Sequence, residues 1–380
     1  MKLALVTETY PPEVNGVAMT LSRFVGGMRE RGHEVQVVRP RQIKEAEKPT
    51  DLLVPGWPIP FYRALRFGLP SVSRLRQAWR TTRPDVVHVA TEGPLGWAAY
   101  TAATRLGIPV TSSFHTNFHH YGSHYGVKVL QNAVLGYLRW FHNRTGCTMV
   151  PTREMSAELT ADGFARLVVI SRGVDTALFS PARRSAALRA QWGASPETPV
   201  VAYVGRLAAE KNLDLAVRAF EAMRAEVPDA KFVLVGDGPA RAPLAKRCPE
   251  FHYAGMQRGE SLAAHYASAD VFLFASVTET FGNVVTEALA SGLLVVGYDY
   301  AAVREHVHDE VNGLTVPLHD ATAFCARSAE AMRRRAEWPA LRAEARLTAE
   351  GVTWAKIVTH FEAALLEASA RAGAREPAST

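Results

Sequence analysis

Short apolar runs alternate with longer amphipathic segments along the whole chain. Apolar runs bounded by turn residues are typical of strands buried in a parallel sheet, and the segments between them have helical spacing. This alternation predicts βαβ units and therefore an α/β protein. The expected strands are Leu3–Val6, Val35–Val38, Val86–Val89, Val110–Phe114, Thr148–Val150, Leu167–Ile170, Val200–Val204, Lys231–Val235, Phe251–Tyr253, Val271–Phe274 and Leu294–Gly297.

The pattern starts again after a polar, proline-containing stretch, Asp175–Pro199. We therefore expect two Rossmann-like, doubly wound domains, residues 1–172 and 173–353, that face each other across a central cleft. Ligands of such sheets bind at the carboxyl ends of the strands, so the loops after the strands are the candidate site. The expected helices are Val17–Arg31, Leu95–Leu106, Val127–Asn143, Arg153–Asp162, Leu213–Ala225, Leu262–Ala267, Val284–Ser291, Ala321–Arg335 and Trp354–Ala370.

Composition narrows the class of protein. The 380 residues are 48% apolar and 21% charged, which excludes a disordered, collagen-like or coiled-coil chain. The cysteines Cys147, Cys248 and Cys325 are too far apart for a disulfide framework or a metal-binding pair, which favours a reducing compartment. The sequence has no apolar run near the ~18 residues of a membrane span and no signal-peptide pattern, so we expect a cytoplasmic protein.

Charge is unevenly distributed. Residues 1–170 hold 20 Lys+Arg against 12 Asp+Glu, a net charge of +8, whereas residues 171–380 hold 23 against 25, a net charge of −2. A basic first half predicts an anionic partner there, although a solvated arginine-rich surface is the alternative. Nucleic acid is not expected as that partner, because the chain lacks a recognition-helix or RNA-binding motif.

Two loops of the first half carry candidate chemistry. Asn15-Gly16 follows the first strand and opens a helix, where free amides suit a phosphate, although a plain turn is the simpler interpretation. The sequence has no GxGxxG, so a nicotinamide or flavin enzyme is not expected. His115 follows the fourth strand and can donate to a sugar hydroxyl or a carbonyl while still neutral near pH 7. A zinc site formed by His115, His119, His120 and His124 is disfavoured, because no Asp, Glu or Cys is interleaved.

In the second half, Gly205-Arg206 follows the first strand and Lys211 comes shortly after, around the start of a helix. A guanidinium and an ammonium near a helix N-terminus suit a diphosphate, although two surface cations are the alternative. Glu279 lies in the loop after Val271–Phe274, and Glu287 lies inside the next helix. We expect Glu279 to meet a ligand and Glu287 to accept from a ribose diol.

With these motifs the chain resembles a retaining GT-B glycosyltransferase of family 4. The resemblance covers essentially the whole chain and rests on the Pro-Pro to Gly-Val opening, Ser-Phe-His-Thr-Asn, Gly-Arg-Leu to Glu-Lys-Asn, Val-Gly-Asp-Gly-Pro and the Glu-x7-Glu pair. Departures are Asn15 for a glycine, Leu294 for a proline and Ala301-Ala302 for two glycines. None of them removes a charged candidate ligand.

The resemblance implies roles for individual residues. His115 and Glu279 would contact the transferred sugar, and Arg206 and Lys211 the donor diphosphate. It also implies that a C-terminal helix near 354–372 returns to the N-terminal domain. The other implied donor-binding residues are Asn15, Gly16 and Gly205, then Gly236, Tyr253 and Met256 near the base, the backbone of Phe281, Gly282, Asn283 and Val284, and Glu287 at the ribose.

The implied activity is transfer of a hexose, mannose or glucose, from GDP-mannose or a UDP-hexose to a membrane lipid or lipid-linked acceptor, with retention of configuration. No cofactor or metal ion is expected. The alternatives are transfer to a soluble sugar or polysaccharide, or a phosphorylase or sugar-nucleotide epimerase on the same architecture.

Residues 57–80 contain five arginines, five aromatic residues and no acid. This composition suits the headgroup region of an anionic bilayer. It predicts a peripheral protein at the inner face of the cell membrane, with 121–144 as a second candidate segment; the alternative is that the aromatics are core and the arginines merely solvated. The residues assigned to this surface are Arg63, Arg66, Arg74 and Arg76.

Overall fold

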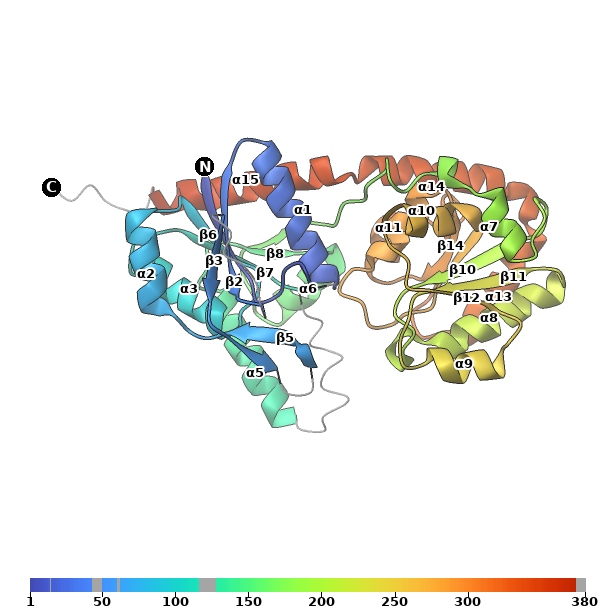
Figure 1. Ribbon diagram of the computed structural model, residues 1–380, viewed down its shortest axis with the longest axis horizontal. Coiled ribbons are helices and arrows are strands. Elements are labelled where there is room, and N and C mark those ends of the chain that lie inside the picture. Colours follow the sequence, from blue (N-terminus) through green and yellow to red (C-terminus); the bar gives the residue numbers. More distant parts are fainter. Residues whose placement is uncertain (14, 43–49, 60–61, 116–127, 374–380) are drawn as a thin grey trace. The chain divides into compact units, whose positions relative to one another are not determined.

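The computed structural model describes residues 1–380 except 14, 43–49, 60–61, 116–127 and 374–380. The side chains of 58–66, 128–131 and 372–373 are also outside the description. The chain forms two compact units (Figure 1): the N-terminal unit contains Met1–Arg172 and the C-terminal segment from Trp354, and the C-terminal unit contains Gly173–Thr353.

The N-terminal unit is built on a parallel sheet of seven strands within the described residues, in the order β3-β2-β1-β6-β7-β8-β9. A separate antiparallel pair, β4-β5, follows β3 in the chain. The strands are β1 (Lys2–Val6), β2 (Glu34–Pro40), β3 (Asp51–Val54), β4 (Gly56–Ile59), β5 (Tyr62–Gly68), β6 (Val86–Val89), β7 (Val110–Ser113), β8 (Thr148–Val150) and β9 (Leu167–Val169). The helices are α1 (Gly16–Glu30), α2 (Val72–Thr81), α3 (Pro94–Thr104), α5 (Lys128–His142), α6 (Arg153–Ala161) and α15 (Trp354–Gly373).

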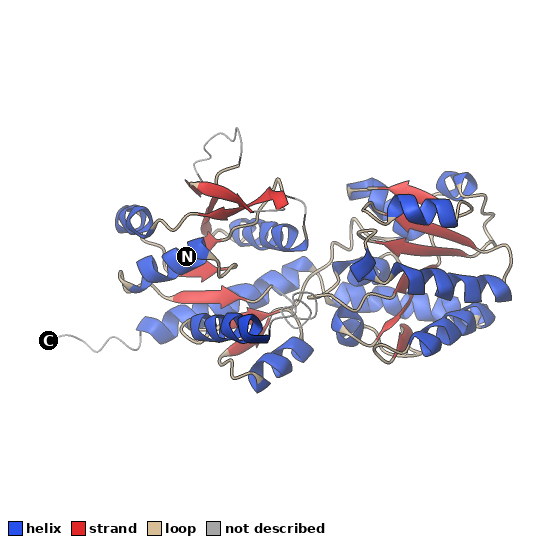
Figure 2. Ribbon diagram, turned by 90° about the horizontal axis from the view of Figure 1, so that it is seen from below, coloured by secondary structure: helices blue, strands red, loops and turns tan. Residues whose placement is uncertain are grey.

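Alternating strand residues fill two separate cores, because successive side chains of a strand point to opposite faces of the sheet. Leu3 and Leu5 of β1 join a core with α1 and α15, and Ala4 and Val6 join a core with α2 and α3. The helices that follow these strands along the chain thus cover both faces (Figure 2). This is the doubly wound arrangement that the sequence predicts.

The helix α15 packs on α1, although 323 or more residues separate the two in sequence. Phe24 of α1 stacks on Phe361 of α15 with ring centroids 4.3 Å apart, and Trp354 meets Phe24 edge-on at 5.9 Å. A Cβ on Gly27 would lie 2.6 Å from Val358, so a glycine is needed where the two helices approach. Since Phe361 is fully buried, α15 is part of the N-terminal unit's core.

The C-terminal unit repeats the plan with a parallel sheet in the order β12-β11-β10-β13-β14-β15. Its strands are β10 (Val200–Val204), β11 (Lys231–Val235), β12 (His252–Gly255), β13 (Val271–Phe274), β14 (Leu294–Tyr298) and β15 (Gly313–Val316). Its helices are η1 (Pro181–Arg183), α7 (Ala186–Gln191), η2 (Ala209–Lys211), α8 (Leu213–Glu226), α9 (Arg241–Arg247), α10 (Gly259–Ser268), α11 (Asn283–Ala290), α12 (Ala301–His306), α13 (Ala321–Arg333), η3 (Arg335–Glu337) and α14 (Trp338–Gly351).

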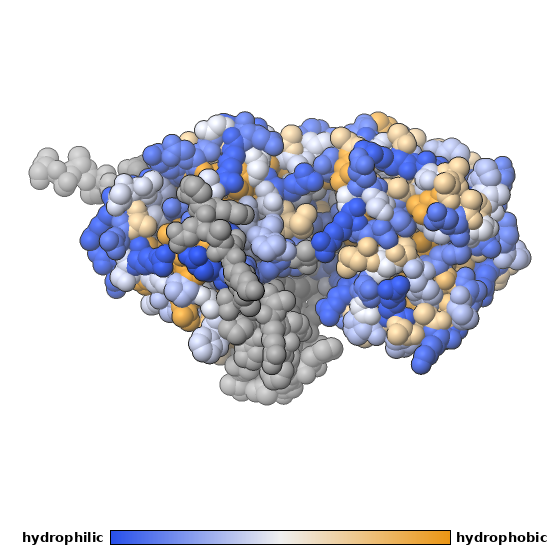
Figure 3. Space-filling view, viewed as in Figure 1, coloured by the Kyte–Doolittle hydropathy of each residue, from blue (hydrophilic) through white to orange (hydrophobic). Residues whose placement is uncertain are grey.

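Two cores again lie on the two faces of this sheet. Val201 and Tyr203 of β10 pack with α8 and α13, whereas Val200 and Ala202 pack with α10 and α11. On the face seen in Figure 3, hydrophilic residues cover most of this unit and apolar residues form small areas between them. The apolar runs of the sequence are therefore used mainly inside the unit.

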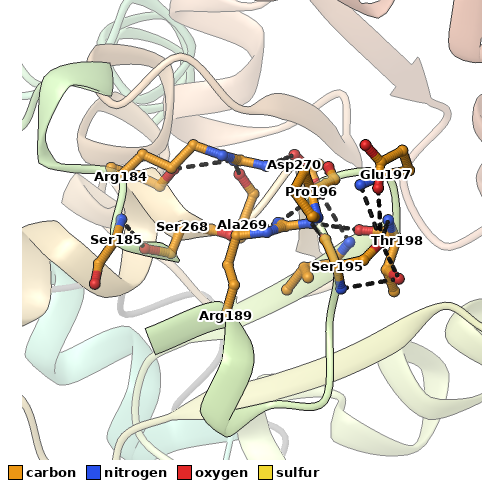
Figure 4. A network of polar contacts seen from close by, with 12 residues as sticks. Arg184, Ser185, Arg189, Ser195, Pro196, Glu197, Thr198, Ser268, Ala269 and Asp270 are labelled. Carbon is orange, nitrogen blue, oxygen red and sulfur yellow. Dashed lines mark hydrogen bonds and ion pairs between the residues drawn. The ribbon is translucent and has the colours of Figure 1, made fainter. Parts of the chain in front are cut away.

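Figure 4 shows how the segment before β10 is fastened to the sheet. The buried carboxylate of Asp270 accepts from Arg184 at 2.9 Å, from Arg189 at 3.1 Å and from the backbone amide of Val200 at 2.9 Å. Arg189 also donates to the carbonyl oxygen of Thr198 at 2.6 Å. This network lies at the amino ends of β10 and β13, and it leaves the carboxyl ends for the loops that carry the site.

Each sheet has a point where the strand order reverses. The reversal lies between β1 and β6 in the N-terminal unit, and between β10 and β13 in the C-terminal unit. Connections leave in opposite directions there, which opens a crevice at the carboxyl ends where ligands of α/β proteins bind. The candidate residues are therefore expected to gather at these two reversal points.

Candidate active site

At the reversal point of the C-terminal unit, the loops after β10 and β13 meet through an ion pair. The Nζ of Lys211, in η2, lies 2.5 Å from Oε1 of Glu279. Their side chains are 21% and 16% exposed, so both are partly shielded yet reachable from solvent. Two residues that the sequence analysis selected separately are thus neighbours, and they place an ammonium group beside a carboxylate.

Hydrogen bonds to the backbone hold both loops in place. The hydroxyl of Tyr300 donates to the carbonyl oxygen of Glu279 at 2.7 Å, and the hydroxyl of Thr278 donates to that of Glu210 at 3.0 Å. The side-chain amide of Asn212, which adopts the left-handed conformation with φ 54°, donates to the carbonyl oxygen of Ala275 at 3.2 Å. The ion pair is therefore built on two loops that are tied to each other.

Glycines allow the backbone to pass closely at two places in this site. A Cβ on Gly236, with φ +135°, would lie 1.9 Å from the carbonyl oxygen of Gly205, so the loops after β10 and β11 touch through their backbones. Gly282 has φ +94°, and a Cβ there would lie 2.9 Å from Phe274. Gly282 precedes α11 without providing a side-chain cap, which leaves the first-turn amides of Asn283 and Val284 suited to an oxygen ligand.

Glu287 lies inside α11 and is held by a buried tyrosine. The hydroxyl of Tyr266, in α10, donates to Oε2 of Glu287 at 2.9 Å. Burial raises the pKa of Tyr266 well above its ordinary value, and the Glu287 carboxylate adds to the rise. Tyr266 is therefore a permanent donor that fixes one carboxylate oxygen of Glu287.

Other residues predicted for this site are exposed or are engaged elsewhere in the fold. The side chain of Arg206 is 60% exposed and lies 3.3 Å from Glu210, so it does not form a joint clamp with Lys211 in this structure. The hydroxyl of Tyr253 donates to the carbonyl oxygen of Cys248 at 3.0 Å, which ties it to the fold. Met256 is 56% exposed after β12, and the Phe281 side chain is buried in the core, so only its backbone can face a ligand.

At the reversal point of the N-terminal unit, Asn15 caps α1. Its Oδ1 accepts from the amide of Ala18 at 2.8 Å, and its side-chain amide donates to the Thr9 hydroxyl at 2.7 Å. Gly16 is the first residue of the helix, and apart from its chain neighbours and its own helix no described atom lies within 4 Å of the place a Cβ would take. The structure therefore leaves open space beside the first turn, which suits the approach of a ligand.

His115 follows β7 and is buried. Its Nδ1 lies 2.9 Å from an Nη of Arg172, which is the last residue of this unit before the C-terminal unit begins. Burial lowers the pKa of His115 well below its ordinary value, and the charge of Arg172 lowers it further. The imidazole is therefore neutral, as the sequence analysis expects of a histidine that donates to a sugar.

Sequence reasoning missed a pair of glutamates at the same reversal point. Glu8 follows β1 and Glu92 follows β6; the amide of Glu8 donates to the Thr91 hydroxyl at 2.9 Å, and Oε1 of Glu8 accepts from the amide of Leu95 at 3.2 Å. Burial raises the pKa of each carboxyl to about 7, and the charge of Glu8 contributes to the rise at Glu92. The sequence signal that could have found them is their position directly after two predicted strands, which become neighbours in the sheet.

The remaining candidates lie at the edge of the description or beyond it. Arg63 and Arg66 lie in β5, where the backbone alone is described, and Arg74 and Arg76 lie in α2. The residues His119, His120 and His124 of the disfavoured zinc site fall outside the described residues. Within the described part of the chain, no group of three His, Cys, Asp or Glu side chains is arranged to hold a metal ion.

Two doubly wound units, each with polar loops at its reversal point, have the architecture of a GT-B glycosyltransferase. The structure is similar to a sucrose-phosphate synthase from Thermosynechococcus elongatus, with a TM-score of 0.79, 19% identity and coverage of 97% of this chain and 99% of that one. This similarity confirms the predicted fold class.

Comparison with protein families gives the membership. Residues 14–178 match the model of Glycosyltransferase Family 4, and residues 198–334 match that of Glycosyl transferases group 1. A GDP-mannose-dependent alpha-mannosyltransferase of Mycolicibacterium smegmatis is 35% identical over 98% of this chain and 100% of its own length. An alpha-monoglucosyldiacylglycerol synthase of Acholeplasma laidlawii is 30% identical over 83% of this chain and 84% of its own. The chain belongs to glycosyltransferase family 4 and is a glycosyltransferase.

Proposed function

We propose that the chain transfers a hexose, with mannose first and glucose second, from a nucleotide diphosphate sugar to a membrane lipid or lipid-linked acceptor. The observation that carries the proposal is the contact of Lys211 with Glu279 at the reversal point of the C-terminal unit. The names of the relatives support the substrates, since one is GDP-mannose-dependent and another makes a glucosyl lipid.

Charge development in the reaction explains the arrangement. Departure of the nucleoside diphosphate leaves an oxocarbenium-like sugar and builds negative charge on the β-phosphate. Lys211 stabilises that charge, and Arg206 joins it once its side chain turns from Glu210 toward the diphosphate. Charge-assisted contacts of this kind contribute about 1.5–3 kcal/mol each. Glu279 accepts hydrogen bonds from the sugar hydroxyls, and Glu287, fixed by Tyr266, accepts from the ribose. Asn15 and Gly16 lie by the diphosphate and His115 by the transferred sugar.

Since two basic side chains and helix amides meet the diphosphate, we propose that the reaction needs no divalent cation and no cofactor. We also propose that configuration is retained, by attack of the acceptor hydroxyl on the face from which the diphosphate leaves. In that step the C–O bond to the acceptor forms, the bond to the β-phosphate oxygen breaks, and the hydroxyl proton passes to the departing phosphate.

The donor is identified by thermal shift and by turnover. The chain is incubated with GDP-mannose, UDP-glucose, UDP-galactose, UDP-glucuronate and UDP-GlcNAc, each with diacylglycerol-type and soluble acceptors. A cognate donor at 100 times its dissociation constant adds about 2.7 kcal/mol to the free energy of unfolding. We expect GDP-mannose to give the largest shift and a radiolabelled lipid product. If the chain transfers sugar from none of these donors to any of the acceptors, the proposal is contradicted. Conversion of the nucleotide sugar in the absence of an acceptor supports the epimerase alternative.

The acceptor half carries the proposed membrane surface. Trp57 is 62% exposed at β4 and Leu69 is 38% exposed before α2, whereas Trp79 of α2 is buried in the core with Leu75. Exposed apolar residues beside basic ones suit an anionic headgroup layer, at about 1 kcal/mol per basic residue near the surface. Because Trp79 is buried, it is not one of the aromatic residues that can contact a bilayer. Within the described residues, no helix has both the length and the apolar character needed to cross a membrane.

Liposome co-sedimentation tests this surface. We expect the chain to pellet with phosphatidylglycerol vesicles at low salt and to be released as salt rises. The test variant changes Arg63, Arg66, Arg74 and Arg76 to Ser and loses binding. The control variant removes the same charge from exposed arginines of the C-terminal unit, Arg247, Arg304, Arg333 and Arg335, and keeps binding. Equal loss in both variants, or no pelleting at low salt, contradicts the membrane proposal and leaves hexose transfer standing.

A further inference from the structure

Two buried residues that are distant in sequence meet near the end of β7. His115 is 8% exposed and Arg172 is 6% exposed, and an Nη of Arg172 lies 2.9 Å from Nδ1 of His115. The guanidinium is held by a second hydrogen bond, to the carbonyl oxygen of Ile170 at 3.3 Å, and it lies 6.0 Å from the ring centroid of Phe24. The direction in which Arg172 points is therefore set by three elements of the N-terminal unit.

A guanidinium carries only hydrogen-bond donors, so the nitrogen that it meets has to be an acceptor. A neutral imidazole that accepts at Nδ1 carries its proton at Nε2. We propose that Arg172 is a positioning residue for sugar transfer: it fixes His115 in the Nε2–H tautomer and so aims a hydrogen-bond donor at the transferred sugar. This rests on the proposed function, which places His115 at that sugar.

The charges around Arg172 and His115 indicate that Arg172 has a role other than stabilising the fold. Among the described residues, no carboxylate forms an ion pair with Arg172, and burial lowers its pKa to about 10. A buried charge without an acid partner costs free energy, and apolar side chains fill such places more cheaply. Stability alone therefore gives no reason for an arginine at this position, whereas control of the imidazole does.

The groups that face His115 all keep it neutral. These are Arg172, His88 and His142, and each lowers the pKa of His115 after the larger effect of burial. The pKa values of His88 and His142 are themselves lowered to about 3, chiefly by burial. His88 is engaged at both nitrogens, with the hydroxyls of Thr111 at 2.9 Å and Ser113 at 2.8 Å. Arg172 is the one permanent charge in this group, so its removal changes the electrostatics of His115 most.

Nuclear magnetic resonance reads the tautomer directly. The full chain is labelled with ¹⁵N-histidine, and the His115 signals are assigned by their loss in His115→Gln. We expect a pyridine-type shift for Nδ1 and a pyrrole-type shift for Nε2. In Arg172→Met the two shifts move toward each other as both tautomers become populated, and Arg172→Lys restores them in part. His142, whose Nδ1 is 2.9 Å from the Ser112 hydroxyl, is the internal control and keeps its shifts.

Kinetics then connects the tautomer to the reaction. Arg172→Met lowers kcat about tenfold to a hundredfold, because a misplaced or wrongly protonated group loses its transition-state contact. The KM for the donor changes little, since the donor cations belong to the other unit. The acid limb of the pH profile moves to higher pH, since the charge that lowers the pKa of His115 is gone. Arg166→Met is the control: Arg166 donates to the carbonyl oxygens of Asn143 and Thr145 and leaves His115 untouched.

A proton at Nδ1 of His115 in the unaltered chain, or an unchanged kcat in Arg172→Met, overturns the proposal. A failure of the unaltered chain to transfer sugar from any donor is a different result. It overturns the proposed function, whereas the spectrum still decides whether Arg172 sets the tautomer.

Discussion

The two reversal points have the same topology and opposite electrostatics. In the C-terminal unit, a cation and a carboxylate stand 2.5 Å apart and are partly exposed. In the N-terminal unit, Glu8 and Glu92 follow the two strands at the reversal point, and the pKa values of both carboxyls are raised to about 7. The same fold therefore offers an ion pair at one reversal point and, at the other, two carboxyls that burial keeps partly uncharged near neutral pH.

The largest expected effect comes from breaking the ion pair on the cationic side. Under the proposed function, Lys211→Met removes the charge that meets the diphosphate and leaves the Glu279 carboxylate to repel it. We expect kcat/KM for the donor to fall by at least about a hundredfold, at the upper end of one charge-assisted contact. Steady-state kinetics measures this. The control Lys246→Met removes an exposed lysine of the same unit and keeps its rate; an equal loss in both variants contradicts the role of Lys211.

Glu279→Gln tests the other half of the same pair. Loss of one charge-assisted contact to the sugar as charge separates predicts a fall in kcat of about tenfold to a hundredfold. Binding of the nucleoside diphosphate, measured by calorimetry, changes far less. Glu250→Gln is the matched control, because Glu250 pairs with Arg224 at the surface and neither residue belongs to the proposed site. An unchanged kcat in Glu279→Gln removes this residue from the site.

The N-terminal carboxyls give a smaller effect, on stability. The pKa of Glu8 is raised from 4.5 to about 7 in the folded chain, so the folded state binds its proton more tightly than the unfolded state. The free energy of unfolding therefore falls as pH rises from about 4.5 to 7. In Glu8→Gln this loss is absent, and we expect the variant to be more stable than the unaltered chain at pH 8 by on the order of 2 kcal/mol.

Thermal unfolding at pH 5 and pH 8 measures the effect of Glu8→Gln. The difference between the variant and the unaltered chain is small at pH 5, where Glu8 is protonated in the folded state. Glu30→Gln, at an exposed position of α1, is the control and shows no such pH dependence. A stability difference of Glu8→Gln that is the same at both pH values shows that Glu8 does not titrate as described.

The smallest expected effect is none. In the proposed mechanism Lys211, Arg206 and the amides of α11 neutralise the diphosphate, so we expect the transfer rate to stay unchanged in excess EDTA. The assay uses the cognate donor in metal-free buffer, with and without added Mg²⁺. Activity that is abolished by chelation and restored by Mg²⁺ or Mn²⁺ contradicts metal independence.

The fold was predictable where strands are central and apolar. Val86–Val89 and Val271–Phe274 have the bounds that the sequence predicts, because a strand buried on both faces reads as an uninterrupted apolar run. The edge strand β3 and the pair β4-β5 were missed. The former begins with a charged residue, Asp51, and has only three apolar residues in a row; the latter contains one proline and two arginines that break the apolar pattern.

The site was predictable as single residues and not as contacts. Loop motifs select Lys211 and Glu279, whereas their pairing spans 68 residues and depends on β10 and β13 becoming neighbours. The contact of Arg172 with His115 spans 57 residues and has no local signal. Glu8 and Glu92 look like ordinary polar loop residues until the assembled unit partly buries them. Sequence patterns report local geometry and chemistry, and burial is a property of the assembled unit.

The packing of α15 on α1 has a consequence for the order in which the chain is made. Synthesis completes residues 173–353 before Trp354–Gly373 exists. The C-terminal unit can therefore finish folding before the N-terminal unit, although its synthesis starts later. Until Phe361 emerges from the ribosome, Phe24 and its neighbours on α1 have no partner for their stacked contact. The apolar face of α1 therefore stays uncovered while residues 173–353 are synthesised. The N-terminal unit is completed only when α15, the last helix to be made, packs on α1.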